Sequence, residues 1–295
     1  MCASVTNIPQ ENLTIPEMKG LRSHKCLVAI VTLDSSPLYF TPKGGVLMKQ
    51  LVTRMSRLLR IRHDRVKNPS LDRVYLANQY LSGSGLEIGA LHHPLPVHAT
   101  VRVRYVDRMG EAELRRHYPE LQEQHFVPID IVDNGETLSL VNDASQDFVI
   151  ANHFLEHCED PISTLGTFFR VLRPGGIVYL AIPEKTSTFD RDRPVTPLEH
   201  FWEDHRSGPQ HSRWAHYREW AELVDKRCDD LETHALRLLN KNYSIHFHVW
   251  DQSSWLLFLH SMQQTFGFHI EVMLRHGVEI INVLRKVESQ TKETV

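Results

Sequence analysis

Two carboxylates, Glu87 and Asp107, each lie in an apolar run, and they stand about 20 residues apart in the chain. Residues 85–90 indicate a buried strand that ends in a tight turn at Gly89, and residues 101–107 indicate a second strand that ends at Asp107. A glycine at such a turn lets the backbone approach a ligand closely, and a carboxylate at a strand tip can accept hydrogen bonds from two ribose hydroxyls. This spacing is typical of the strand–connection–strand unit of nucleotide-binding α/β folds.

Two later apolar segments also contain or end in polar side chains. Asp130 lies in the segment 126–132, and Asn152 and His153 close the segment 147–153. Ligands of open α/β sheets bind at the carboxyl ends of the strands. We therefore expect these three side chains to lie near the same site as Asp107.

The order of the apolar runs predicts an α/β fold. Alternating apolar strands and helices favour a parallel sheet that is covered on both faces. After residue 183 the chain is rich in His, Trp, Arg and Glu, which indicates a helical cap, and two closely spaced strands then predict an antiparallel hairpin. The expected strands are 85–89, 101–107, 126–132, 147–153, 176–183, 268–274 and 278–284, and the expected helices are 71–81, 162–172, 196–206, 212–240 and 251–265.

A family resemblance rests on five segments taken in order. They resemble the class I S-adenosylmethionine-dependent methyltransferases, and most closely the bacterial methyltransferase type 11 group. The resemblance covers about residues 70–285 and implies a Rossmann-like, seven-stranded, mostly parallel sheet with one antiparallel C-terminal strand and a helical cap insertion. It divides the chain into an N-terminal tail with a basic helix (1–69), a methyltransferase domain (70–184 and 261–290) and the cap (185–260). The five segments are residues 86–90, 105–107, 128–131, 147–157 and 170–180.

The resemblance also implies S-adenosylmethionine as the cofactor and gives each motif a role. The implied binding residues run from the methionine part through the ribose and the adenine to the sulfonium. They are Glu87, Gly89 and Ala90; then Asp107; then Asp130 and Ile131; and last Asn152 and His153.

The glycine loop departs from the family pattern, in which three glycines occupy alternate positions. Here the second and third positions are Leu91 and His93, followed by Pro94. A glycine loop that cradles phosphates is therefore missing, which counts against the alternative of an NAD-type oxidoreductase of related topology. A non-catalytic binding module that keeps the fold is a further alternative.

The methyl acceptor should contact the cap. Methyl transfer mainly requires alignment of the nucleophile, and an oxygen or nitrogen acceptor can also need a general base. We predict catalytic or substrate contacts for His200, His246 and His248, and a small-molecule or saccharide acceptor methylated on oxygen or nitrogen rather than carbon. In an extended segment His246 and His248 would share one face. Glu156 and His157 are equally consistent with a pocket wall, a general base or plain packing.

The chain has 19 histidines, so clusters of them arise readily by chance. We expect no metal ion. The alternative is a zinc or non-haem metal site formed by His246 and His248 with His200 or His205.

Composition limits the other functions. The net charge of −3 gives no global sign of nucleic-acid binding. The four cysteines are scattered without a C-x-x-C pair, which fits a reducing, cytoplasmic compartment. No apolar run reaches the roughly 18 residues of a membrane span.

Residues 43–67 form a basic amphipathic pattern that predicts either weak contact with an anionic membrane surface or a solvated helix on the domain. Met48 is an alternative natural start, and the oligomeric state is not predicted.

Overall fold

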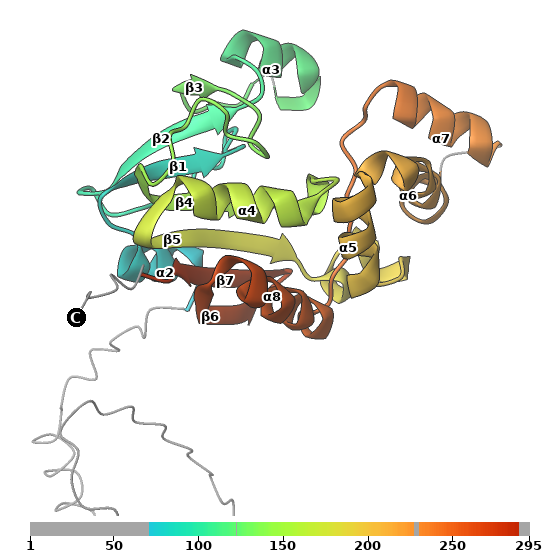
Figure 1. Ribbon diagram of the computed structural model, residues 1–295. Coiled ribbons are helices and arrows are strands. Elements are labelled where there is room, and N and C mark those ends of the chain that lie inside the picture. The colour runs from blue at the N-terminus through green and yellow to red at the C-terminus, as the bar shows by residue number, and fades with distance from the viewer. Residues whose placement is uncertain (1–70, 122, 227–229, 289–295) are drawn as a thin grey trace, which may run out of the picture. The chain divides into compact units, whose positions relative to one another are not determined.

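A computed structural model describes residues 71–121, 123–226 and 230–288 (Figure 1). Seven strands form one sheet in the order β3-β2-β1-β4-β5-β7-β6. Strands β1 to β5 run parallel, and β7 alone pairs antiparallel with both of its neighbours. The predicted α/β class, with its single antiparallel C-terminal strand, is confirmed.

The strands begin and end close to the predicted positions, except for the third. Residues 126–130 were expected to be part of β3, but the strand comprises only Ile131–Val132. The reason is that this segment bonds elsewhere: the Val127 amide donates to the Leu91 carbonyl, 2.9 Å away. The strands are β1 Ser84–Ile88, β2 Arg102–Asp107, β3 Ile131–Val132, β4 Gln146–Asn152, β5 Leu172–Pro183, β6 Phe268–His276 and β7 Glu279–Lys286.

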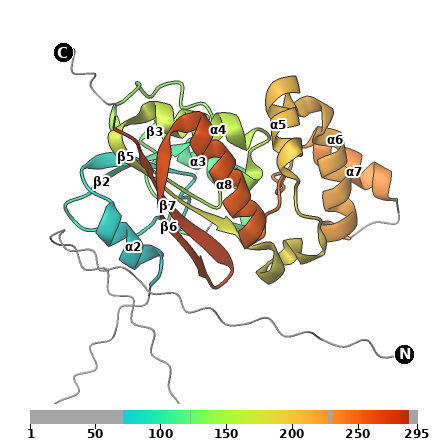
Figure 2. The same ribbon diagram turned by 60° about the horizontal axis from the view of Figure 1, so that its bottom comes forward.

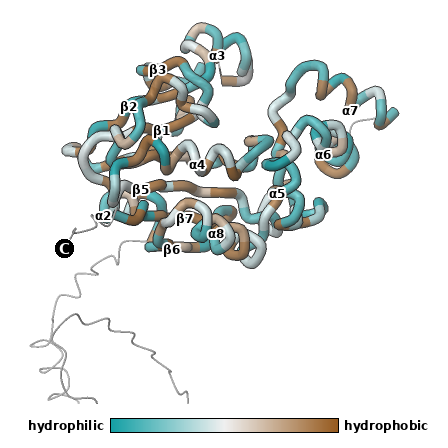
Figure 3. The backbone as a smooth tube through the Cα atoms, viewed as in Figure 1, coloured by the Kyte–Doolittle hydropathy of each residue, from teal (hydrophilic) through white to brown (hydrophobic). Residues whose placement is uncertain are grey.

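The sheet is buried on both faces because alternate residues of its central strands point to opposite sides. Val149 and Ala151 of β4 join the core that packs under α4 (Pro161–Val171) and α8 (Gln252–Phe266). Phe148 and Ile150 of the same strand join the core that packs against α2 (Arg73–Tyr80). Figure 3 shows β5 as a mostly hydrophobic strand between these layers. Near-continuous apolar strands are what a parallel sheet covered on both sides requires.

The connection from β1 to β2 holds no helix, in agreement with the expected helices, none of which falls there. Residues 89–101 form turns and irregular structure. Pro94 and Pro96 lack the amide hydrogen that a helix interior needs, which explains the open loop. The next connection does hold a short helix, α3 (Glu111–His117).

The cap lies beyond the carboxyl end of β5 (Figures 1 and 2). The predicted helix 212–240 is two helices, because α6 passes into a π-helical turn at Ala221–Asp225 that ends with Lys226 at φ 53. The cap has its own apolar cluster, formed around Tyr217, Trp220 and Leu238. α8 packs under the sheet, in the same core as Phe201 of the cap, and the expected cap boundary at residue 260 stays a prediction. The cap helices are α5 Leu198–Ser207, α6 Arg213–Trp220 and α7 Leu231–Asn240.

No helix within the described ranges is both long and apolar enough to cross a membrane. The predicted basic helix at 43–67, with its membrane-surface contact, and the rest of the tail 1–69 lie outside the described residues. The expected helix 71–81 is confirmed as α2.

Candidate functional site

A cavity of about 300 Å³ lies at the carboxyl ends of the parallel strands. Its sheet side follows β1 at Gly89, β2 at Asp107, β3 at residues 134–136 and β4 at His153. This is the edge at which open α/β sheets bind ligands. The opposite wall comes from the cap and consists of Arg213, Tyr217, Asn242, Tyr243, Ser244 and Phe247.

Asp107 and Gly89 both lie on this wall, as predicted from the sequence. Asp107 is the last residue of β2 and only 7% exposed, and its burial raises the pKa of the carboxyl. Gly89 has φ 65, a left-handed conformation that glycine adopts without strain. A Cβ at Gly89 would meet no neighbour closer than Phe154, at 3.9 Å, so its backbone faces open space. The open backbone at Gly89 can contact a nucleoside directly, and the Asp107 carboxylate beside it can accept hydrogen bonds from ribose hydroxyls.

We predict that Gly89→Val weakens cofactor binding about tenfold or more, because a branched side chain fills that space and strains a left-handed residue. The loss should be seen by calorimetry with S-adenosylmethionine. Gly110→Val is the matched control, because a Cβ there also meets nothing within 4 Å but φ is −71 and the residue precedes α3. Equal affinities for the two variants would contradict the close approach at Gly89.

Glu87 lies behind the wall rather than on it. Its Oε1 accepts a hydrogen bond from the Leu95 amide at 2.9 Å, while Oε2 is buried with no partner among the described residues. Burial raises the pKa of this carboxyl to about 7. Ala90 is also buried away from the cavity, and the adjacent Leu91, at φ 50, lines it instead.

Asp130 and Ile131 do not lie on the cavity wall as the structure describes it. Asp130 precedes β3, and its Oδ2 accepts the Tyr105 amide at 2.8 Å, which fixes the strand edge. Because β3 ends at Val132, the residues that follow it reach the cavity: Asn134, Gly135 and Glu136. Asn-Gly directly after an apolar run marks a turn at a strand end and is the signal that could have found them. The adenine-binding role expected of Asp130 and Ile131 stays a prediction without support from their positions.

His153 lies on the wall, and Asn152 lies beside it with a buried Oδ1 that has no partner within the described ranges. His153 has φ 51, an unfavourable conformation for a residue with a side chain. Its Nε2 is 2.9 Å from Glu279, and its Nδ1 is 3.4 Å from Glu156. The two carboxylates outweigh its burial and raise the pKa of His153 to about 9. The cavity therefore has a cationic imidazolium at the end of β4.

This pairing predicts a pH-dependent stability. A histidine whose folded pKa is raised stabilises the fold fully below its unfolded pKa of about 6.5, and this contribution is lost as pH rises through about 9. His153→Gln should lower the free energy of unfolding by about 1–2 kcal/mol at pH 6, a value discounted for partial exposure. At about pH 10 the variant and the wild type should differ little. Urea unfolding at both pH values measures this, and a difference independent of pH would contradict the imidazolium.

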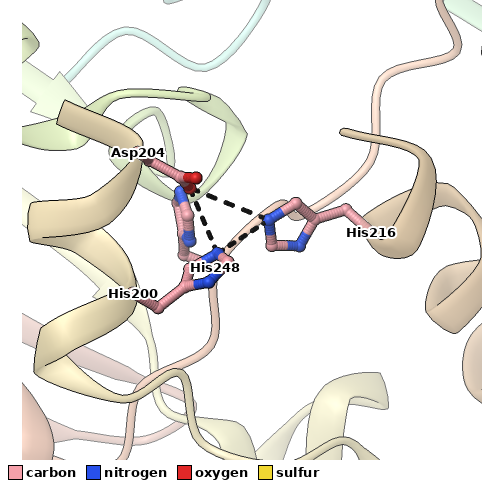
Figure 4. Close-up of side chains that lie close together, drawn as sticks. All are labelled: His200, Asp204, His216 and His248. Carbon is pink, nitrogen blue, oxygen red and sulfur yellow. Dashed lines mark hydrogen bonds and ion pairs between the residues drawn. The ribbon is translucent and has the colours of Figure 1, made fainter. Parts of the chain in front are cut away.

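The three histidines predicted to contact the acceptor are not on the described cavity wall. His246 and His248 also do not share one group. His246 Nδ1 bonds Asp190 Oδ2 at 2.7 Å, beside Glu156 and His157. His248 joins His200 in a different cluster, shown in Figure 4. Their role in contacting the acceptor stays a prediction that these positions do not support.

His157 does reach the cavity, as one of the readings of the sequence allowed. Its Nδ1 lies 2.8 Å from the Ile245 carbonyl, to which it can donate, and burial is the largest cause that lowers the pKa of the ring. Cys158 lines the cavity too, but burial raises the pKa of its thiol well above the usual range, so it stays protonated.

Glu136 is the residue on the wall whose titration fits catalysis best. Burial and the nearby carboxylates of Glu159 and Asp160 raise the pKa of Glu136 to about 7. A carboxyl group with a pKa near neutrality can take up a proton and release it at physiological pH. Glu159 lines the same wall but is 3.2 Å from the Arg213 guanidinium of the cap.

A protein-family model described as "Methyltransferase domain" matches residues 58–243, more than half of the chain. A Mycolicibacterium smegmatis protein named "Probable S-adenosylmethionine-dependent methyltransferase" is 32% identical over 94 residues, which cover 31% of this chain and 33% of that protein. The match thus spans about a third of the relative's length.

Solved structures that match this chain do so with low sequence identity and low TM-scores. An S-adenosylmethionine-dependent methyltransferase from Aquifex aeolicus is 11% identical with a TM-score of 0.39, covering 72% of this chain and 85% of its own. The CurJ carbon methyltransferase is 18% identical with a TM-score of 0.36, covering 70% of this chain and 49% of its own. The family model, in contrast, matches more than half of the sequence. The chain therefore belongs to the methyltransferase-domain family, and its sheet has the strand order and the single antiparallel strand of the class I, S-adenosylmethionine-dependent fold.

Proposed function

We propose that this methyltransferase transfers a methyl group from S-adenosylmethionine to an oxygen or nitrogen of a small polar acceptor, such as a saccharide. The observation that carries the proposal is one cavity with two unlike walls. The sheet wall offers Gly89 and Asp107 to a nucleoside, and the cap wall offers hydrogen-bonding side chains to a second molecule.

The residues present fit the cofactor. Asp107 can accept hydrogen bonds from its ribose hydroxyls, and the open space at Gly89 admits it against the backbone. The partnerless Oε2 of Glu87 supports an ammonium group nearby, reached through water. When bound, S-adenosylmethionine supplies an electrophilic methyl group on a sulfonium.

The acceptor side favours a small molecule with hydroxyl or amino groups. Tyr243, which is exposed, combines an apolar ring with a polar tip, which suits a sugar or a similar ring. The cavity of about 300 Å³ is at the small end of the usual range for ligand sites, and the cofactor would occupy its sheet side, which favours one small acceptor or one terminal sugar unit on the cap side. Glu136 can take the proton that an oxygen or nitrogen nucleophile loses.

The test is an acceptor screen that measures release of S-adenosylhomocysteine. Hydroxylated and amino-bearing metabolites and saccharides should include substrates, and Tyr243→Ala, at an exposed residue of the cap wall, should raise the acceptor KM with little change in cofactor affinity. Calorimetry with S-adenosylmethionine and NAD precedes the screen. Binding of NAD alone would support the oxidoreductase alternative, and cofactor binding without turnover of any acceptor would support the binding module.

A further inference from the structure

Three imidazoles and one carboxylate meet in the cap (Figure 4), and none of the four residues lines the cavity described above. His200 and Asp204 come from α5, His216 comes from α6, and His248 comes from the segment after α7. One potential ligand atom of each residue lies within 4.8 Å of those of the other three. His200 and Asp204 are one helical turn apart, so one face of α5 presents both.

The spacing of these atoms resembles a coordination shell. Nε2 of His200 is 3.0 Å from Nε2 of His216 and 3.1 Å from Oδ2 of Asp204, and Nε2 of His216 is 4.0 Å from that oxygen. Atoms bound at about 2.0–2.2 Å around a tetrahedral zinc ion are about 3.3–3.6 Å apart. The three distances bracket this range.

Two buried atoms of the cluster have no hydrogen-bond partner within the described residues: Oδ2 of Asp204 and Nδ1 of His248. The side chains are 0% and 1% exposed. Although Oδ2 faces His200 at 3.1 Å, the geometry is not that of a hydrogen bond. Burying such atoms unpaired is costly, and one cation between the four groups would satisfy both.

Hydrogen bonds to the other polar atoms of Asp204 and His248 already fix the orientation of these two side chains. Ser212 Oγ donates to Asp204 Oδ1 at 2.8 Å, which leaves Oδ2 for a ligand. Nε2 of His248 lies 3.3 Å from the Glu159 carbonyl and can donate to it, which leaves the lone pair on Nδ1. Such outer bonds fix the tautomer and ring of metal-binding histidines.

We propose that His200, Asp204, His216 and His248 bind one divalent zinc-type ion that fastens α5, α6 and the 243–250 segment together. Three nitrogens and one oxygen are a donor set that zinc accepts in tetrahedral geometry. Four protein ligands close the shell, which is the mark of a structural site. The proposal departs from the sequence expectation of no metal, and it uses Asp204 and His216 where the sequence alternative had His246.

The ion would support the acceptor wall without touching it. Arg213 and Tyr217 flank His216 on α6, and Phe247 adjoins His248, and all three line the cavity. This consequence rests on the proposed function, whereas metal binding itself does not. His200 is 27% exposed at its side chain, which offers a path of entry for the ion.

A second group, Glu156, His157 and His246, also has ligand atoms within 4.8 Å of one another. Both Glu156 oxygens are also buried without a hydrogen-bond partner within the described residues, but the group offers three residues rather than four, and its carboxylate charge is already balanced by the His153 imidazolium at 3.4 Å. The four-residue cluster is therefore the stronger metal site, and the smaller group serves as the competing outcome in the test.

The experiment is a Co²⁺ titration of full-length, tag-free protein that has been dialysed against a chelator. We expect one equivalent to bind with the visible absorption of tetrahedral cobalt, and Zn²⁺ to displace it. His200→Ala and His216→Ala should each abolish the absorption, and Ser212→Ala should weaken binding about 10–100-fold. His205→Ala is the matched control on the same helix, since its ring bonds Asp160 instead, and it should bind as the wild type does.

Absence of a saturable cobalt spectrum in the wild type would overturn the proposal. So would wild-type binding by both His200→Ala and His216→Ala, or binding that is lost only in His246→Ala, which would place the ion in the other group. Circular dichroism of each variant confirms that it is folded, and His200, being part-exposed, is the substitution that the fold tolerates best. Metal binding that is confirmed in a protein without methyl transfer would leave this inference standing and remove the proposed function.

Discussion

Asp107→Ala is expected to weaken the binding of S-adenosylmethionine by about 10²–10³-fold, with the fold unchanged. The carboxylate at the end of β2 can accept two hydrogen bonds from the ribose, and bonds to a charged group contribute about 1.5–3 kcal/mol each. Burial raises the pKa of this carboxyl in the free protein, so its removal takes away a group that is poorly solvated there. Calorimetry with S-adenosylmethionine and S-adenosylhomocysteine should show the same loss for both ligands.

The matched control is Asp130→Asn, because it lies near the same sheet edge but off the described cavity wall. An amide oxygen can still accept the Tyr105 amide hydrogen that Asp130 now receives. The affinity of Asp130→Asn for S-adenosylmethionine should stay within about threefold of the wild type, as for a substitution outside the binding site. An equal loss in both variants would restore the adenine role predicted for Asp130, and unchanged binding in Asp107→Ala would refute the ribose contact.

The strand ends could be predicted because burial on both faces leaves a strong local pattern. Asp107 ends a strand with an alternating pattern, His153 directly follows a nearly continuous apolar strand, and both were correctly expected at the carboxyl edge. The third strand could not be predicted so well. Residues 126–130 are extended and apolar enough to resemble a strand, but Val127 bonds to Leu91, far away in sequence. The end of the strand at Val132 was nevertheless expected correctly, and the adenine role of Asp130 and Ile131 rested on the family resemblance rather than on the strand pattern.

The histidines of the cap show a second limit. Their alternation in the sequence suggested one shared face for His246 and His248. In the structure residues 245–250 are all buried, so the alternation of polar and apolar residues does not correspond to an exposed and a buried face. Each ring is oriented by a distant partner, Asp190 for His246 and the Glu159 carbonyl for His248. Contacts between residues 50 or more positions apart leave no periodic signal in a single sequence.

Glu136→Gln is the second large effect that we expect, a fall in kcat of about 10²–10⁴-fold with little change in cofactor affinity. Glutamine keeps the size of the side chain but cannot take a proton. The carboxyl of Glu136 makes no hydrogen bond or ion pair with the described residues that would hold it in one ionisation state, and its pKa of about 7 reflects burial and two neighbouring acids. A base must be deprotonated to act, so kcat/KM for the acceptor should rise as pH increases through about 7.

The pH dependence of kcat/KM that Glu136 causes must be separated from any effect of Glu87, whose pKa is also about 7. Glu87 lies off the described cavity wall at the methionine end, so its ionisation should change cofactor affinity rather than the transfer step. Saturating S-adenosylmethionine removes that contribution from kcat/KM for the acceptor, while calorimetry across the same pH range reports it. If Glu136→Gln retains the rise near pH 7 under saturating cofactor, Glu136 is not the base, and His157 becomes the next group on the wall to test, because its neutral ring can also accept a proton.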